Sequence, residues 1–384
     1  MLATSKIEIS QQALAKNLAF IRAQIGEQPR LSSVVKGNAY GHGLEVFVPM
    51  AEACGIRHFS VFDAAEAYRV QQVIQHPDTE IMIMGMIEDE HVDWAIESGI
   101  SFYTFELERL AYAAKAAQRI KKRARVHIEI ETGMNRIGYE AHELPAVAAL
   151  LSSHPEHLHF EGLSTHFAGA ESIANYVRVT QQRKLYKKIS KWFSAQHLQP
   201  QFYHTACSAA AMRYPPTRMD MVRIGILQYG FWPSRETLIE FNAKANRQDN
   251  PLERLITWKS QVMDVKTVRT GEYVGYGTSY LASDTMKIAT IPIGYAHGFS
   301  RALSNAGRVL IRGKRVGVIG MVNMNAITVD ASQLENLERG DEVVIIGYQG
   351  DLELSVSSFG EFSNQVNYEL LTRLPMDIPR HVVD

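Results

Sequence analysis

The first two-thirds of the chain alternates helical and extended patterns of hydrophobic residues. Ser10 suits a helix N-cap, and apolar residues recur at helical spacing after it: Leu14, Leu18, Ile21 and Ile25. Short β-rich runs begin at Leu31 and recur near residues 56–62, 80–84, 100–104, 124–131, 157–165, 201–205 and 221–224. Helical stretches, 64–73, 105–117 and 172–193 among them, separate these runs. Eight βα repeats in roughly 230 residues predict an α/β fold, a TIM-type (β/α)8 barrel with its chemistry on the loops after the strand C-termini.

The pattern changes after about residue 240, beyond which helical periodicity fades and glycine-separated strands follow. The expected strands lie at 256–268, 287–295, 308–311, 316–319, 326–329 and 342–346, and two short helical segments at 356–364 and 367–374. We therefore predict two domains. A barrel domain covers residues 10–240, and a C-terminal, mainly β domain covers residues 241–384, with the N-terminal strand 1–9 as a candidate additional member.

Composition excludes several classes of protein. Of 384 residues, 46% are hydrophobic and 21% are charged, which is typical of globular proteins. Forty Lys and Arg against forty-one Asp and Glu leave a net charge of −1, so neither nucleic acid nor an anionic membrane is an expected partner. The longest apolar run, 81–87, is far shorter than the roughly 18 residues of a membrane span, and no signal peptide is visible. Two cysteines, Cys54 and Cys207, favour a reducing cytoplasm.

The most informative segment reads VVKGNAYGHG over residues 34–43. It places Lys36 at the end of an apolar strand, where small residues follow and leave room beside the amine. A lysine in a restricted site can lose its proton and act as a Schiff-base nucleophile or general base. A solvated lysine on a glycine-rich turn gives the same pattern, so Lys36 alone does not decide between the two.

Other candidate residues are equally ambiguous when taken singly. His166 suits a buried histidine, Arg223 an edge-strand arginine, and Tyr276 an aromatic hairpin. His157 and His159 share one strand face, but no Cys, Asp or Glu stands at a spacing that completes a metal site. We therefore predict no metal.

An ordered series of motifs along nearly the whole chain resembles the alanine racemase family, whose members are pyridoxal-phosphate enzymes. Besides 34–43, the matching stretches are TGMNRIG at 132–138, STHF at 164–167, SAA at 208–210, VRIGI at 222–226, GYG at 275–277 and IPIGYA at 291–296. A single match of this length is weak, whereas the series keeps its order from Lys36 to Arg380. The resemblance implies a homodimeric isomerase that interconverts L- and D-alanine, with D-alanine supplied to peptidoglycan.

The resemblance also assigns roles on the cofactor side. Lys36 would carry pyridoxal 5'-phosphate and move a proton at the substrate Cα, and Arg223 would face the pyridine nitrogen, where it weakens the electron sink. His166 would help to orient Arg223. The groups that would hold the phosphate are Tyr40, Ser208 and the backbone around Gly225 and Ile226.

On the substrate side, the resemblance implies that Arg136 takes the substrate carboxylate and the phenolic oxygen of the cofactor. Tyr276 would be the second acid–base group, on the opposite face of Cα. Together with Met324, whose backbone would contact the carboxylate, it would come from the partner subunit, so that the homodimer shares its active sites.

Five positions depart from the family pattern. Glu129 stands where many members have a carbamylated lysine, and already supplies the negative charge. The other departures are Cys207, Met321, His297, and Met376 in place of a pocket tyrosine. They leave open a serine racemase or one of broader specificity.

Three alternatives fit less well. Non-catalytic pyridoxal-phosphate-binding relatives resemble a lone barrel, whereas this chain also has a β domain and Tyr276. Decarboxylases of this shape usually have a cysteine in the β domain, whereas both cysteines here lie in the barrel, and aldolases of this type need a metal, for which no cluster is visible.

Overall fold

The computed structural model describes residues 3–356, 359 and 367–384. The chain forms two compact units. The barrel unit comprises Gln12–Lys36 and Phe47–Arg254, and the β unit comprises Met1–Gln11, Gly37–Val46 and Leu255–Asp384. The division passes between Lys36 and Gly37, so the segment that follows the candidate lysine belongs to the β unit.

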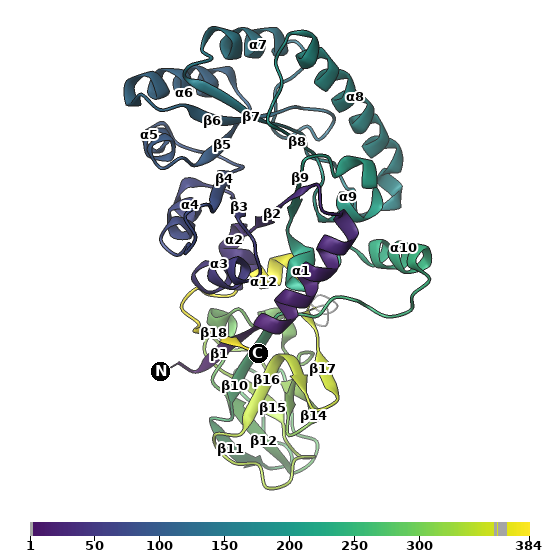
Figure 1. Ribbon diagram of the computed structural model, residues 1–384. Coiled ribbons are helices and arrows are strands. Elements are labelled where there is room, and N and C mark those ends of the chain that lie inside the picture. The colour runs from purple at the N-terminus through teal and green to yellow at the C-terminus, as the bar shows by residue number, and fades with distance from the viewer. Residues whose placement is uncertain (1–2, 357–358, 360–366) are drawn as a thin grey trace. The chain divides into compact units, whose positions relative to one another are not determined.

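In the barrel unit, eight strands of the described chain form one parallel sheet in the order β8-β7-β6-β5-β4-β3-β2-β9 (Figure 1). Their bounds are β2 Arg30–Val34, β3 His58–Val61, β4 Glu80–Ile83, β5 Ser101–Thr104, β6 Ala124–Glu129, β7 Leu158–Ser164, β8 Phe202–His204 and β9 Met221–Ile224. A single parallel bridge, Cys207 to Arg223, joins the two ends, and the Arg223 N–H donates to Ala206 at 2.9 Å. The predicted barrel and its eight strands are confirmed.

Helices follow the strands along the chain (Figure 1). Their bounds are α1 Gln11–Ile25, α2 Lys36–Tyr40, α3 Leu44–Ala53, α4 Ala64–Gln71, α5 Asp89–Glu97, α6 Leu107–Ile120, α7 Leu144–Ser153, α8 Tyr176–Ala195, α9 Ser208–Arg213 and α10 Arg235–Ala245. The expected helices at 64–73, 105–117 and 172–193 correspond to α4, α6 and α8. Among the described residues, no helix is both long enough and apolar enough to cross a membrane.

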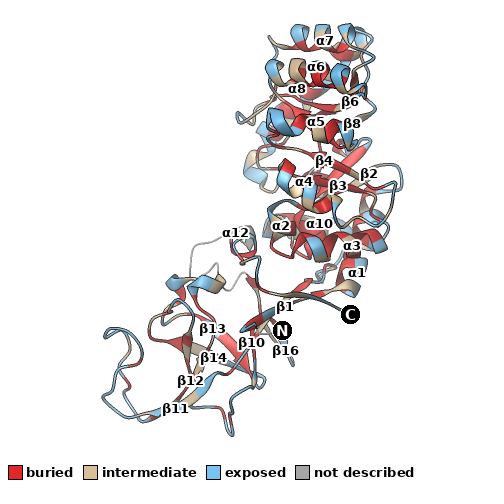
Figure 2. Cartoon of the chain, turned by 90° about the vertical axis from the view of Figure 1, so that its left-hand side faces the viewer, coloured by how far each residue is buried: buried red, intermediate tan, exposed pale blue. Residues whose placement is uncertain are grey.

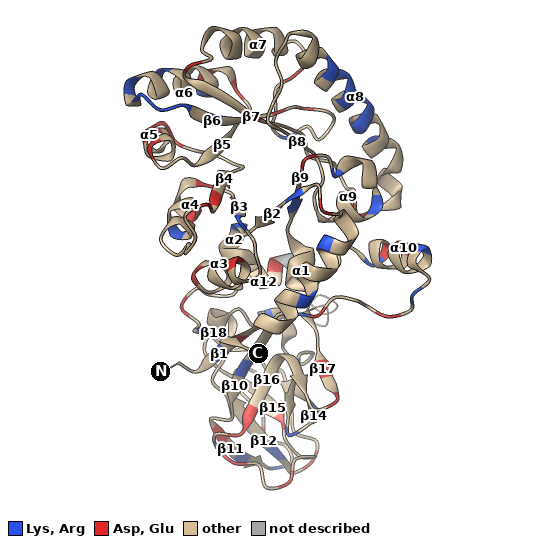
Figure 3. Ribbon diagram, viewed as in Figure 1, with Lys and Arg blue, Asp and Glu red and all other residues tan. Residues whose placement is uncertain are grey.

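Helix α8 shows why such segments are helical. Its buried residues, spaced three or four apart, are Val179, Gln182, Tyr186, Ile189 and Phe193. They form one face of the helix, whereas the other face carries exposed lysines (Figures 2 and 3). This alternation buries the apolar face and leaves the charges solvated.

The interior of the barrel is unusually polar. On β6, the side chains of Arg125, His127 and Glu129 alternate with apolar ones and therefore share one face. Arg125 contacts Glu80 on β4, and His127 contacts His204 on β8. Because β4 and β8 are not neighbours of β6, these contacts cross the inside of the barrel. Branched apolar residues dominate this space in most such barrels.

In the β unit, ten strands of the described chain form a second sheet, ordered β11-β12-β15-β14-β13-β16-β10-β1-β18 with β17 beside β16. Their bounds are β1 Ser5–Ser10, β10 Ile256–Gln261, β11 Asp264–Val268, β12 Met286–Ile291, β13 Arg308–Ile311, β14 Lys314–Ile319, β15 Ile327–Asp330, β16 Glu342–Gln349, β17 Leu352–Leu354 and β18 Arg380–Val383. The mainly β character is confirmed. Strand β1 pairs antiparallel with β10 and parallel with β18.

Three expectations for this unit need comment. The single strand expected at 256–268 is wrong, because the chain forms β10 and β11, which pair with different neighbours. The helix expected at 367–374 is present as α12, Asn367–Thr372. The segment expected to be helical at 356–364 lies mostly outside the described residues.

The turn after Lys36 has a left-handed backbone. Its φ values are 63° at Gly37, 55° at Asn38, 53° at Ala39 and 51° at Tyr40. Such a run is costly for residues with a Cβ, so surrounding contacts must hold it. A Cβ on Gly41 would lie 1.8 Å from the Leu371 carbonyl oxygen, so this close approach requires glycine.

Candidate active site

The candidate residues of the barrel unit cluster at the C-terminal ends of its strands. Lys36 follows β2, Arg136 follows β6, His166 follows β7, and Ser208 follows β8, while Arg223 lies near the end of β9. In barrels of this type, the loops at this end carry the chemistry. The structure therefore places five residues that are far apart in sequence at the end where a site is expected.

Lys36 lies in a positive environment. Burial lowers the pKa of its amine, and the charges of Arg136 and Arg223 lower it further, against an opposing effect of Glu66. Burial and the two arginines favour the neutral amine over the ammonium ion, and they outweigh the opposing effects of Glu66 and Cys207. A larger neutral fraction makes Lys36 a better nucleophile and proton acceptor than an ordinary surface lysine.

Arg223 is 5% exposed and is held mainly by neutral acceptors. Its Nη1 donates to His204 Nδ1 at 2.5 Å and to the His204 carbonyl at 3.0 Å. Its Nη2 donates to the carbonyls of Thr165 at 3.1 Å and Thr205 at 3.3 Å. In the described part of the chain, no carboxylate forms a salt bridge with it. We expected His166 to orient Arg223, but these hydrogen bonds involve His204 instead.

His166 lies near the cations without carrying a charge itself. Burial, followed by the charges of Arg223, Arg136 and Lys36, lowers the pKa of His166 to about 3. The imidazole is therefore neutral at physiological pH. Its backbone carbonyl accepts from Gln182 Nε2 at 2.9 Å, which anchors the loop after β7 to α8.

The loops after β8 and β9 meet at Ser208. The N–H of Gly225 donates to Ser208 Oγ at 2.9 Å, and Ile226 begins the short 3₁₀ helix η3, Ile226–Tyr229. Since Ser208 Oγ accepts this bond, the hydroxyl proton of Ser208 can donate elsewhere. Ser208, Gly225 and Ile226 are therefore adjacent, as a phosphate-binding role requires.

Two glutamates shape the loop that carries Arg136. Glu131, which the sequence analysis did not single out, accepts from the N–H groups of Gly133, Asn135 and Arg136, the last two at 2.7 and 3.4 Å. An acid two residues before a glycine turn is the signal that would have indicated this role. Glu129 is buried and accepts from Ser164 Oγ, and burial raises its pKa although Arg223 and Arg136 oppose the rise. The proposed support of Arg136 by Glu129 stays a prediction.

Three candidate residues belong to the β unit. Tyr40 ends the left-handed turn of α2. Tyr276 is 74% exposed between Gly275 and Gly277, whose φ values are 74° and 70°. Met324 is 56% exposed, and its carbonyl accepts from Ala296 N–H at 3.0 Å.

Comparison with known proteins gives a consistent result over both units. Residues 9–233 match the family model described as "Alanine racemase, N-terminal domain", and residues 255–382 match "Alanine racemase, C-terminal domain". The chain belongs to the alanine racemase family. A curated alanine racemase of Leptospira interrogans is 31% identical over 99% of this chain and 96% of the relative. Alanine racemase 2 of Bacillus subtilis is 34% identical over 98% of this chain and 94% of the relative.

Solved structures of the alanine racemase family agree. The alanine racemase of Clostridium difficile 630 superposes with a TM-score of 0.90 at 28% identity, covering 100% of this chain and 96% of that one. The alanine racemase of Bacillus anthracis, solved with bound L-Ala-P, also gives a TM-score of 0.90, at 29% identity with the same coverage. The family and the two-part fold that the motifs predicted are therefore confirmed.

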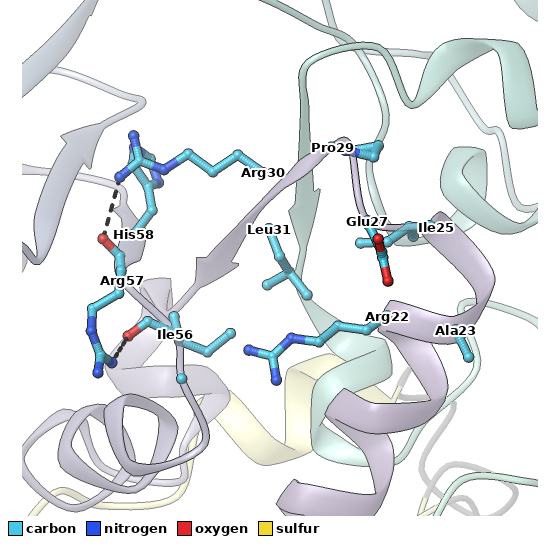
Figure 4. Close-up of a pocket in the computed structure, with 12 residues that line it drawn as sticks. Arg22, Ala23, Ile25, Glu27, Pro29, Arg30, Leu31, Ile56, Arg57 and His58 are labelled. Atoms are coloured by element: carbon cyan, nitrogen blue, oxygen red, sulfur yellow. Dashed lines mark hydrogen bonds between the residues drawn. The ribbon is translucent and has the colours of Figure 1, made fainter.

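A cavity elsewhere in the barrel unit is an alternative location for a binding site. It measures about 520 Å³, and its lining includes Arg22, Arg30, Arg57 and His58 (Figure 4). Arg30 and His58 are the first residues of β2 and β3, so the cavity lies at the N-terminal ends of the strands, opposite to Lys36. None of the candidate residues lines this cavity. In barrels of this type, the active site lies at the other end, where the strands have their C-termini. Within the described residues, no cluster of three or more His, Cys, Asp or Glu could hold a metal.

Proposed function

We propose that this protein interconverts L- and D-alanine and uses pyridoxal 5'-phosphate held at Lys36. The observation that carries the proposal is the environment of Lys36. Its amine has a lowered pKa and lies near Arg136, Arg223 and a neutral His166, at the end of the barrel where chemistry is expected. Membership of the alanine racemase family supports the choice of substrate and cofactor.

The residues present fit a phosphorylated pyridine aldehyde. A primary amine with a lowered pKa suits covalent attachment, and the Ser208 hydroxyl and the N–H of Ile226 are donors of the kind that hold phosphate. The Tyr40 hydroxyl would add a donor from the turn that follows Lys36. When bound, the cofactor withdraws electrons from the substrate Cα and so makes its hydrogen acidic.

Arg223 would set how strong that electron withdrawal is. A guanidinium only donates hydrogen bonds, so a pyridine nitrogen facing it must accept and stays unprotonated. The neutral ring withdraws electrons less strongly, and negative charge at Cα is then short-lived. We therefore expect little transamination beside racemisation.

Racemisation requires proton transfer on both faces of Cα. Lys36 would remove or return the proton on one face while Arg136 holds the substrate carboxylate as a bidentate partner. Tyr276 would act on the other face, and Met324 would contact the carboxylate through its backbone.

We infer that Tyr276 and Met324 act in the site of a second copy of this chain, so that the working form is a homodimer. Their exposure supports this inference, because each presents its side chain or backbone outward from the β unit. Two fixed groups on opposite faces avoid any need for one base to swing across the substrate.

The proposal is tested by adding pyridoxal phosphate and, in separate reactions, L-alanine or L-serine, and by following both the cofactor absorbance and the enantiomers by chiral chromatography. We expect D-alanine to accumulate to an equal mixture. Cofactor binding without D-alanine would instead indicate a binding protein. Carbon dioxide release would indicate a decarboxylase, and conversion of serine alone would indicate a serine racemase.

A further inference from the structure

A line of buried polar side chains leads from Arg223 into the interior of the barrel. Arg223 Nη1 donates to His204 Nδ1 at 2.5 Å, and His204 Nε2 lies 2.9 Å from His127 Nδ1. His127 Nε2 lies 3.5 Å from Glu161 Oε1, a separation longer than an ordinary hydrogen bond. His127, His204 and the Glu161 side chain are fully buried, and none of the proposed catalytic steps uses His127 or Glu161.

The chemistry of these groups dictates where each proton sits. A guanidinium cannot accept, so His204 Nδ1 must be without a proton, and His204 carries its proton on Nε2. That proton faces His127 Nδ1, which must therefore also be without a proton. His127 then carries its proton on Nε2, towards Glu161. The hydrogen bonds run in one direction only, and both imidazoles are neutral while the line is intact.

Two features of the backbone build this line. The β6–β7 ladder pairs Val126 with Phe160 but His127 with Gly162, so Glu161 is an extra residue in a β-bulge. Bulges of this kind redirect a side chain, here towards His127 and Arg125. A Cβ on Gly162 would lie 1.9 Å from His127 Nδ1 and 2.6 Å from His204 Nε2. Only glycine at this position allows the two imidazoles to meet.

The far end of the line is strongly charged. Glu161 accepts from Arg125 Nε at 2.5 Å and from Arg125 Nη2 at 2.8 Å. These two donors keep Glu161 an anion in the interior, where an unpaired carboxylate would be costly. The ring of Tyr103 stacks on His127, with centroids 5.7 Å apart. The line of hydrogen bonds is therefore polarised as a whole, with the anion Glu161 beside His127 and the cation Arg223 beside His204.

We propose that His127 and Glu161 are positioning residues, which act through His204 to hold the Arg223 guanidinium in place with its charge intact. The link from Arg223 to a cofactor nitrogen rests on the proposed function. The proton arrangement does not, because it follows from contacts within the barrel unit alone.

The first test uses the cofactor-free protein and nitrogen-detected NMR of its histidines at neutral pH, with signals assigned by His127→Gln and His204→Gln. We expect His127 and His204 to show a bare Nδ1 and a protonated Nε2. An imidazolium, or a proton on Nδ1 of either residue, would overturn the proposal whether or not the protein is a racemase.

The second test breaks the line at its bulge. Gly162→Ala should disrupt the His127–His204 bond and change the His204 and Arg223 signals. Gly317→Ala is the matched control, because Gly317 also lies in a strand and a Cβ there would meet nothing within 4 Å. If Gly162→Ala does not fold, Glu161→Gln takes its place in the test. This substitution keeps the side-chain volume but removes the negative charge, and it should shift the His204 Nδ1 signal. Unchanged His204 and Arg223 signals in Glu161→Gln would overturn the proposal.

The third test asks whether the line affects chemistry. In the enzyme with pyridoxal phosphate bound, a displaced Arg223 no longer prevents protonation of the cofactor nitrogen. Glu161→Gln should then raise transamination relative to racemisation by about tenfold, the lower range for loss of an outer orienting partner in metal sites. A purely structural role would lower both rates equally, and that result would contradict the proposed positioning role.

Discussion

Arg223 and Tyr276 are opposite cases among the candidate residues, both in their exposure and in the contacts that hold their side chains. Arg223 is 5% exposed and bonded to three backbone carbonyls and a buried histidine, all within the barrel unit. Tyr276 is 74% exposed between two glycines at which an added Cβ would meet no atom within 4 Å. Among the described residues, its phenol makes no hydrogen bond. One residue is fixed in place by its own chain, and the other is not.

This difference indicates which parts of the site one chain completes by itself. Except for Tyr40, which belongs to the β unit, the groups proposed to hold the cofactor lie in the barrel unit, so we expect cofactor binding to depend on one chain. The second base has no such support, so its function should depend on a partner. The following predictions test this contrast, beginning with the largest expected effect.

Lys36→Ala should abolish both covalent cofactor attachment and racemisation. Loss of the amine removes the attachment point and one base, so activity should fall by about 10⁴-fold or more. Borohydride reduction followed by peptide mapping measures the attachment. A cofactor still trapped at an unchanged position would show that another residue carries it.

Tyr276→Phe should lower racemisation in both directions by about 10²–10⁴-fold, the usual contribution of a general acid–base group. The absorbance of the bound cofactor should not change, because Lys36 and the barrel unit are intact. Near-normal rates in this variant would rule out Tyr276 as a base.

Mixing Lys36→Ala chains with Tyr276→Phe chains distinguishes an active site shared between two chains from one that a single chain completes. In a mixed dimer, the intact Lys36 of one chain meets the intact Tyr276 of the other, so one of the two sites regains both bases. Part of the activity should return. If mixed dimers form and no activity returns, the site is not shared.

Glu129→Gln should lower the activity without lowering the stability of the fold. Glu129 has a raised pKa in the folded protein, so its ionised form destabilises the fold at pH values above that pKa. The amide should therefore leave the melting temperature unchanged or higher. Racemisation should fall by about tenfold, since a charge-assisted bond to Arg136 becomes a neutral one. Full activity would show that Glu129 does not support Arg136, and bicarbonate depletion should have no effect on the wild type.

Met376→Tyr should have the smallest effect. The wild-type enzyme should process alanine best and serine measurably, because a flexible methionine replaces a rigid tyrosine. The tyrosine variant should lower the serine-to-alanine ratio of kcat/KM by roughly tenfold or less. An unchanged ratio would remove Met376 from the pocket.

The barrel was predictable because the local hydrophobic pattern of the sequence indicates each of its strands and helices. Each strand is a short apolar run, and α1 keeps its helical spacing from Leu14 to Ile25. Pairing partners carry no such local signal. The break between β10 and β11 near Val262 follows from the different strands with which the two pair, and β1 pairs with β18, which lies more than three hundred positions later in the chain. Periodicity alone could indicate neither.

The candidate site was predictable to the same extent, because local motifs can be recognised in the sequence and long-range contacts cannot. Motifs indicated Lys36, Ser208 and Arg223, but not the partners of Arg223. His127 and His204 stand in ordinary-looking strands, and the alternation around His127 also suits a strand with one solvated face. Only the closed barrel turns that polar face inwards. A glycine directly after an acid in an apolar strand, as at Glu161, was the available signal for the bulge.

The turn after Lys36 has a consequence for the order in which the molecule is made. Its Gly41 carbonyl accepts two bonds from Arg380, a residue 339 positions later in the chain. At about 5–20 residues per second, roughly 17–70 s of synthesis separate the two. The barrel strands meet their neighbours long before that. The turn beside the proposed cofactor lysine therefore gains these two hydrogen bonds only after 339 further residues have been synthesised.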